Sequence, residues 1–174
     1  MQVFRNRHDG TFEDISAASG LSQLPPASRR GAAFGDINND GHVDTVVLNI
    51  GEPPALLLNT THNSNHRVMF QLIGATSNRA AIGARVTVRS ASFTQFNEVR
   101  SGASYLSHND LRLHFGLGQD DNIAAVEIAW PSGKADTLRD LNADFIYVVA
   151  EGEGIRQRIA LPSVASESSA AKSQ

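Results

Sequence analysis

One short segment of the sequence, residues 36–44, places oxygen-bearing side chains at alternate positions. Asp36, Asn38, Asp40 and Asp44 occupy the first, third, fifth and ninth positions of this segment. Calcium is a hard cation that takes about six to eight oxygen ligands, and alternate residues of a tight loop can point inward around one ion. The spacing therefore predicts a loop that binds one Ca²⁺ ion.

Two neighbouring residues complete the predicted site. Gly41 at the sixth position permits the positive φ that lets the chain double back. His42 at the seventh position would offer its backbone carbonyl oxygen and not its imidazole. The twelfth position is Val47 instead of the glutamate of an EF-hand, so we expect a β-hairpin whose loop wraps the cation. The alternative is an ordinary turn of Asn, Asp and Gly with solvated carboxylates.

No other group of residues predicts a catalytic or metal centre. The chain has no cysteine, and its six histidines show no His-Glu-x-x-His spacing. Glu98, Asp110 and Glu127 could be the acids of a secreted carbohydrate-active enzyme on a β scaffold, but nothing in their spacing pairs them. We therefore predict a non-catalytic protein with no catalytic residues, and keep such an enzyme as the alternative.

Composition and charge narrow the classes of partner. The net charge is −3 over 174 residues with scattered basic side chains, which does not favour nucleic-acid binding. No stretch reaches about 18 apolar residues, so no membrane insertion is expected. Residues 1–6 lack the apolar core of a signal peptide. The chain is then either a cytoplasmic protein or a piece of a larger one, and we favour a piece of a larger extracellular or cell-surface protein.

Period-two alternation predicts an all-β fold. Residues 85–89, 113–117 and 126–130 alternate apolar with polar or small side chains, and residues 145–149 form a continuous apolar run suited to a strand buried on both faces. Residues 131–134 read as a turn, and residues 16–21 as one short helical turn. The inward-facing residues are predicted to be Val86, Val88, Leu113, Phe115, Leu117, Val126, Ile128, Trp130, Tyr147 and Val149.

Two sets of motifs resemble known families. Residues 34–44 (FGDINNDGHVD), followed by an apolar strand, resemble an FG-GAP or VCBS repeat, the blade unit of integrin-type β-propellers. Four pieces further along resemble the ASPIC/UnbV domain of the cartilage-acidic-protein-like family: SNRAAIGARV at 77–86, GASYLSHND at 102–110, HFGLG at 114–118 and WPSGK at 130–134. The chain departs from that family at Arg67, where an aromatic residue is common.

The resemblance implies three regions. Residues 1–60 would form a propeller-blade-like unit of hairpins with the calcium loop, and residues 65–155 an antiparallel β-sandwich or barrel-like ASPIC/UnbV domain. Residues 162–174 are rich in Ser and Ala and predict a disordered tail. A secreted interaction or adhesion module with an unidentified protein or glycan partner follows from the same resemblance.

A single blade needs a neighbour to cover its sheet edges and apolar face. Upstream blades, the ASPIC-like domain or a second copy of the chain could provide it. We expect self-association through residues 1–60, including strand addition by residues 3–6, and a head-to-tail form of this contact would generate a filament. Asn78, Arg79, Tyr105, Asn109 and Asp110 predict either a polar recognition patch or structural turns.

Overall fold

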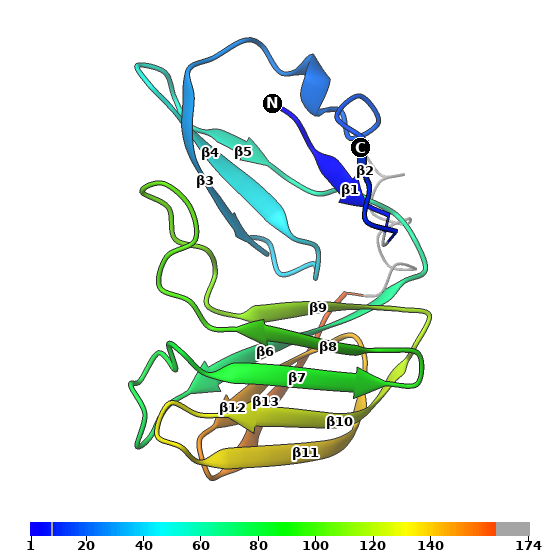
Figure 1. Cartoon of the computed structure of the whole chain (residues 1–174), viewed down its shortest axis with the longest axis vertical. Helices are drawn as coiled ribbons and strands as arrows, with labels where there is room; N and C mark the ends of the chain where they lie inside the picture. The colour runs from blue at the N-terminus through cyan, green and yellow to red at the C-terminus, as the bar shows by residue number, and fades with distance from the viewer. Residues whose placement is uncertain (8, 163–174) are drawn as a thin grey trace.

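The computed structural model describes residues 1–7 and 9–162. An N-terminal part with small sheets stands above a larger sandwich (Figure 1). The N-terminal part contains β1 (Phe4–Asn6), β2 (Phe12–Asp14), the 3₁₀ turn η1 (Leu21–Gln23), β3 (Arg29–Gly35), β4 (Asp44–Asn49) and β5 (Ala55–Leu57). The sandwich contains β6 (His66–Ile73), β7 (Arg85–Ser90), β8 (Thr94–Glu98), β9 (Leu113–Gly118), β10 (Asn122–Ala129), β11 (Ala135–Asn142), β12 (Phe145–Ala150) and β13 (Gly154–Ala160). The predicted all-β class is confirmed.

The N-terminal part is built from short antiparallel ladders. Strands β1 and β2 form a two-stranded sheet, and β3, β4 and β5 form a three-stranded sheet with β4 in the middle. The candidate calcium loop joins β3 to β4, and the pair Gly35 and Asp44 closes the ladder at its base. Gly41 has φ 85° and Asn39 has φ 59°, so the chain reverses within the loop through left-handed residues.

Two four-stranded sheets face each other in the sandwich. Their strand orders are β11-β10-β7-β8 and β13-β12-β6-β9. The pairs are antiparallel except that β6 and β12 run parallel, with Tyr147 beside Phe70. The predicted antiparallel sandwich is therefore confirmed with one parallel pair added, and the described sheets close into neither a barrel nor a propeller.

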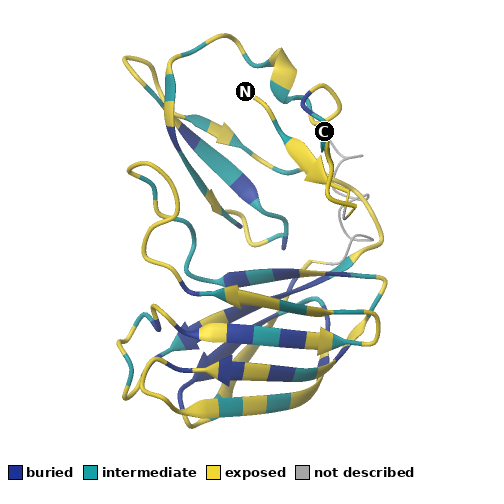
Figure 2. Ribbon diagram, in the orientation of Figure 1, coloured by how far each residue is buried: buried dark blue, intermediate teal, exposed yellow. Residues whose placement is uncertain are grey.

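The core lies between the two sheets of the sandwich. Buried and exposed residues alternate along β7 and β10, as Figure 2 shows by its bands of colour. The ring of Phe70 lies 6.0 Å from that of Phe115, edge to face, and 5.8 Å from that of Tyr147, stacked. All ten residues predicted to face inward are buried, which confirms the strand register read from the period-two pattern.

The remaining expectations concern two turns, the C-terminal tail and membrane insertion. The predicted helical turn at residues 16–21 is present as a turn at 16–19, where the Ser19 amide donates to the Ile15 carbonyl at 2.9 Å. A 3₁₀ turn follows at Leu21–Gln23. The turn at residues 131–134 is present, closed by a hydrogen bond from the Gly133 amide to the Trp130 carbonyl. The predicted tail lies outside the described residues, apart from Pro162. Within the described part of the chain, no helix is long and apolar enough to cross a membrane.

Candidate metal-binding loop

The carboxylate of Asp36 lies inside the candidate loop. Asp36 is 2% exposed, and its two carboxylate oxygens accept hydrogen bonds from the amides of Gly41 at 2.8 Å and Asp40 at 3.1 Å. Burial raises the pKa of Asp36, an effect larger than the opposing hydrogen bond from Gly41, and the negative charge of Asp40 raises it further. The surroundings of Asp36 therefore disfavour the charged form of its carboxylate.

Asp44, at the start of β4, is the second buried acid of the loop. It is 1% exposed and accepts hydrogen bonds from the amides of Ile37 at 2.9 Å and Asn59 at 2.8 Å. Among the described residues, neither Asp36 nor Asp44 forms an ion pair with a Lys, Arg or His side chain. Buried carboxylates are ordinarily paired or bound to a metal. The charge of Arg112 lowers the pKa of Asp36 but does not outweigh its burial, so Asp36 is compensated only in part, and Asp44 has no bonded side-chain cation among the described residues.

The remaining predicted ligands are more exposed. Asp40 accepts a hydrogen bond from the amide of His42 at 2.7 Å, and Asn38 donates its amide to the other oxygen of Asp40 at 2.8 Å. A hollow of about 170 Å³ lies beside these three residues. Its other walls are Leu58, Asn59, Thr60, Thr61 and His62.

The donor set fits a hard cation in type, because each predicted ligand offers an oxygen. The orientation fits less well. Within the described residues, no three His, Cys, Asp or Glu side chains are grouped so as to hold a metal. The carboxylates instead turn onto backbone amides and onto Asn38. Rotation of Asp40 and Asn38 away from each other would be needed to direct their oxygens at one ion.

Three side chains of the sandwich hold the loop from outside through its carbonyls. Arg112 donates to the carbonyl of Asp36 at 2.5 Å, and Arg67 donates to the carbonyl of Asp40. His114 contacts the carbonyl of Gly41 through Nε2 at 2.8 Å. The loop is therefore also the junction between the two parts of the protein.

Residues 102–110 form the second part of this junction, and this segment rises from the sandwich beside β3 (Figure 1). The amide of Phe34 donates to the Asn109 side chain at 3.1 Å, and the Asp110 amide donates to the Phe34 carbonyl at 2.9 Å. A Cβ at Gly35 would lie 2.8 Å from that of Asp110, and one at Gly31 would lie 2.6 Å from the Ser107 hydroxyl. Glycine is thus required at both points of close approach.

The predicted polar patch is brought together only in part. Arg79 and Asp110 line one hollow of about 530 Å³, while Asn78, Tyr105 and Asn109 do not line it. Asn78 is engaged in a turn, where its side chain exchanges hydrogen bonds with the backbone of Ile82. Tyr105 accepts a hydrogen bond from Arg30, whose guanidinium also lies 4.6 Å above the Tyr105 ring. Together with the Asn109 contact to β3, these bonds give the residues structural roles in turns and at the junction.

The three acids considered for an enzyme are not brought together. Glu98 and Asp110 line one cavity, but Glu127 lies beside a different one and pairs with Arg89 at 3.1 Å. Asp110 is held by Arg112 through an ion pair at 2.5 Å. No pair of free carboxylates for acid and base chemistry is formed by these three residues.

Sequence reasoning missed the residues that hold the junction. Arg67 is 5% exposed in β6, next to the apolar residues 68–70. The sequence marked it as a departure from the family but did not indicate its role at the junction. Glu151 is 3% exposed and was also missed. Burial alone would raise its pKa, but hydrogen bonds from Ser132, Ser77 and nearby backbone amides lower the pKa of Glu151 to about 2. Glu151 thereby ties residues 75–77 and the 131–134 turn to the end of β12.

Comparison with known families agrees with this geometry. Residues 1–47 match the FG-GAP-like repeat, and residues 74–156 match the family described as ASPIC and UnbV. The region that matches the FG-GAP-like repeat thus docks on the region that matches ASPIC and UnbV. The first region holds the candidate loop, and the second supplies Arg112 and His114.

The chain is similar to cartilage acidic protein 1 from three vertebrates. It is 39% identical over 69 residues to the Xenopus tropicalis protein, which covers 40% of this chain and 10% of the relative. It is 44% identical over 61 residues to the Homo sapiens protein (34% and 9%) and 28% identical over 138 residues to the Mus musculus protein (76% and 21%). The chain thus spans about a tenth to a fifth of the length of the curated relatives it matches.

Proposed function

We propose that this chain is a calcium-stabilised, non-catalytic interaction module of an extracellular protein. One observation carries the calcium assignment: Asp36 and Asp44 are buried at the base of an all-oxygen loop, and no cationic side chain of the described residues is bonded to either carboxylate. A divalent cation would supply the missing counter-charge.

The ligands of the ion would be Asp36, Asn38, Asp40, the carbonyl oxygen of His42 and Asp44. Three carboxylates with one Ca²⁺ leave a net charge of about −1. A hollow opens beside Asn38, Asp40 and His42, and Asp36 and Asp44 do not line it. The rearrangement of Asp40 and Asn38 costs their mutual hydrogen bond. We therefore expect the weak affinity of extracellular calcium modules, on the order of 10⁻⁴ to 10⁻³ M.

An interaction role is favoured over an enzymatic one by how the acids are used. Asp110 is committed to Arg112, and Glu127 to Arg89. The similarity to cartilage acidic protein 1 and to the FG-GAP-like repeat supports an extracellular setting. The partner would be a protein or a glycan.

Self-association through residues 1–60 is part of the same proposal. Leu48, Ile50 and Leu56 are at least half exposed on or beside the three-stranded sheet, at 50%, 58% and 54%. Exposed apolar side chains gathered on one small sheet mark a surface that another molecule can cover. Strand β1 is paired with β2 on one side only. A second copy could therefore add to the other edge of β1 or meet the sheet of β3, β4 and β5.

Calcium titration by isothermal calorimetry and thermal unfolding in 10 mM CaCl₂ or EDTA tests the calcium assignment. At the expected affinity, saturating calcium stabilises the folded state by about 1.4–2.7 kcal/mol, or about 3–10 °C in Tm. Asp40→Ala should weaken binding about tenfold or more, because it removes a charged ligand. The matched control is Asp9→Ala, which removes an exposed turn aspartate bonded to Thr11 and should leave calcium binding unchanged. No heat of binding up to 10 mM calcium, together with equal Tm values in calcium and EDTA, would refute the assignment.

A further inference from the structure

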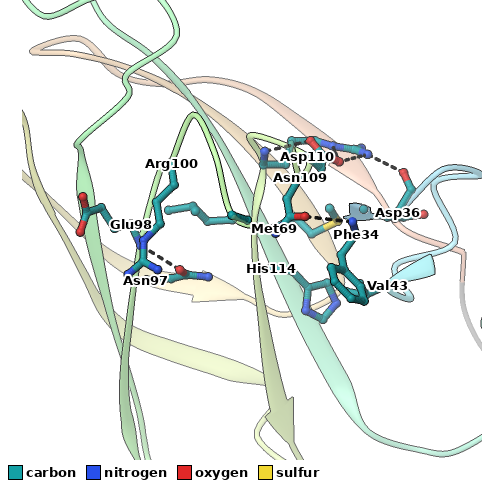
Figure 3. Close-up of a pocket in the computed structure, with 14 residues that line it drawn as sticks. Phe34, Asp36, Val43, Met69, Asn97, Glu98, Arg100, Asn109, Asp110 and His114 are labelled. Atoms are coloured by element: carbon teal, nitrogen blue, oxygen red, sulfur yellow. Dashed lines mark hydrogen bonds and ion pairs between the residues drawn. The ribbon is translucent and has the colours of Figure 1, made fainter. Parts of the chain in front are cut away.

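A second polar hollow lies at the junction, on the side of the loop that faces β8 and β9 (Figure 3). Its volume is about 300 Å³, which is at the small end of the range for ligand pockets. Its walls come from both parts of the protein, including Phe34 at the end of β3 and Asn97, Arg100 and Asn109 of the sandwich. A ligand here would contact the two domains at once.

Three hydrogen-bond donors of this cavity have no partner in the described chain. Within residues 1–7 and 9–162, the exposed guanidinium of Arg100 forms no hydrogen bond or ion pair. Asn109 uses its side-chain oxygen for the amide of Phe34, and Asn97 uses its own for the amide of Glu98. The amide nitrogens of both asparagines are therefore left to donate. One cation and two amide donors on one hollow match the needs of a carboxylate.

Three acids also line the cavity, and among the described residues none of them is bonded to these donors. The carboxylate of Asp36 accepts hydrogen bonds from the amides of Asp40 and Gly41. Asp110 is occupied by Arg112, through an ion pair at 2.5 Å and a hydrogen bond from the Arg112 amide at 2.9 Å. Figure 3 shows the carboxylate of Glu98 turned away from Met69 and His114 at the centre of the view. His114 is itself engaged with the carbonyl of Gly41.

Arg112 also lines the cavity but is engaged by Asp110 and by the carbonyl of Asp36, and the remaining side chains are apolar. Phe34, Val43, Met69 and Leu113 present only carbon or sulfur atoms in their side chains. A ligand that fits would therefore carry a charged oxygen group at one end and an apolar body at the other. We propose that this cavity binds a small carboxylate with an apolar body, held by Arg100, Asn97 and Asn109. Such a group is offered by a free organic acid or by the C-terminal residue of a peptide. This proposal goes beyond the calcium site and does not depend on it.

Titration of the ¹⁵N-labelled chain, followed by NMR, tests the proposal with three probes. N-acetyl-leucine mimics a peptide end, benzoate mimics a free acid, and N-acetyl-leucinamide is the uncharged control. For about ten non-hydrogen atoms, the expected dissociation constant is about 1–10 mM. The side-chain signals of Asn97, Asn109 and Arg100 should shift with at least one acid and not with the amide. Tighter binding of N-acetyl-leucine than of benzoate identifies a peptide end as the source, and the reverse identifies a free acid.

Variants separate this site from general charge effects. Arg100→Gln should weaken binding at least about tenfold, because it removes the cation from a side chain with no partner in the fold. Asn109→Asp keeps an oxygen for the Phe34 amide but replaces the donor with an anion, and should abolish binding. Glu98→Gln is the control on the same stretch of chain and should bind equally or more tightly. Shifts of equal size with the amide, unchanged affinity in Arg100→Gln, or no shift with either acid at 20 mM would each overturn the proposal.

Discussion

Replacing Phe115 of β9 with alanine should lower the free energy of unfolding by about 3–5 kcal/mol. The side chain is 2% exposed, and its ring meets Phe70 edge to face at 6.0 Å. A buried aromatic ring removes about 150–250 Å² from water, worth at most about 4–6 kcal/mol at about 25 cal/mol per Å². The aromatic contact with Phe70 contributes about 0.5–1.5 kcal/mol more. The range known for such substitutions and the value worked from buried area both place the loss of stability well above that of an ordinary surface substitution.

Phe96 of β8 provides the matched control. It is 69% exposed, with Arg85 at 5.5 Å from its ring centre, so Phe96→Ala should cost less than about 1 kcal/mol. Urea unfolding can be followed by the fluorescence of Trp130, which is the one tryptophan of the sequence and is 4% exposed in the sandwich. In a chain of this size, the Phe115 variant should melt about 6–20 °C lower. Similar losses in the two variants would refute the assigned core.

Three further predictions concern the rest of the molecule. Hydrogen bonds outweigh the burial of Glu151 and lower its pKa to about 2, so its contribution to stability is present above about pH 4.5 and is lost as the pH falls towards 2. Glu151→Gln should therefore flatten this part of the curve of unfolding free energy against pH, measured by urea unfolding. Gly41 (φ 85°) and Gly133 (φ 88°) have similar backbone conformations, but a Cβ at Gly41 would lie 2.1 Å from Nε of Arg67, whereas one at Gly133 would have no atom within 4 Å. Gly41→Ala should therefore destabilise the protein more than Gly133→Ala, and equal losses in Tm would contradict the close contact. Leu56→Ser should reduce the self-association proposed for residues 1–60, as measured by sedimentation, and a wild-type chain that stays monomeric at tens of micromolar would end that proposal.

The sandwich was predictable because its information is local. In β7 and β10, alternate residues face the core, so the period-two pattern identifies Val86, Val88, Val126 and Ile128 without knowledge of their neighbours. The parallel pairing of β6 with β12 was not predictable in this way. Tyr147 and Phe70 are far apart in the sequence, and a continuous apolar run is compatible with either strand direction.

The candidate site was predictable in its residue types and not in its surroundings. The spacing of oxygen side chains in residues 36–44 identifies the loop, and Gly41 marks its turn. The orientation of Asp40 towards Asn38 depends on rotamers that spacing does not determine. The hydrogen bonds from Arg67 and His114 to the loop could not be predicted from the sequence, because each is made to a backbone carbonyl, which every residue carries.

The docking of residues 102–110 against β3 limits the symmetry of any assembly that extends the three-stranded sheet. Asn109 and Asp110 occupy the amide and the carbonyl of Phe34, so the edge of β3 is already used at that end. Among the described residues, β5 is then the edge of this sheet that lacks a neighbour on its outer side. Two chains that meet edge to edge would each present β5, and a contact of one surface with itself closes as a two-fold pair. Strand addition through this sheet would therefore end at a dimer, and filament growth would require a different surface.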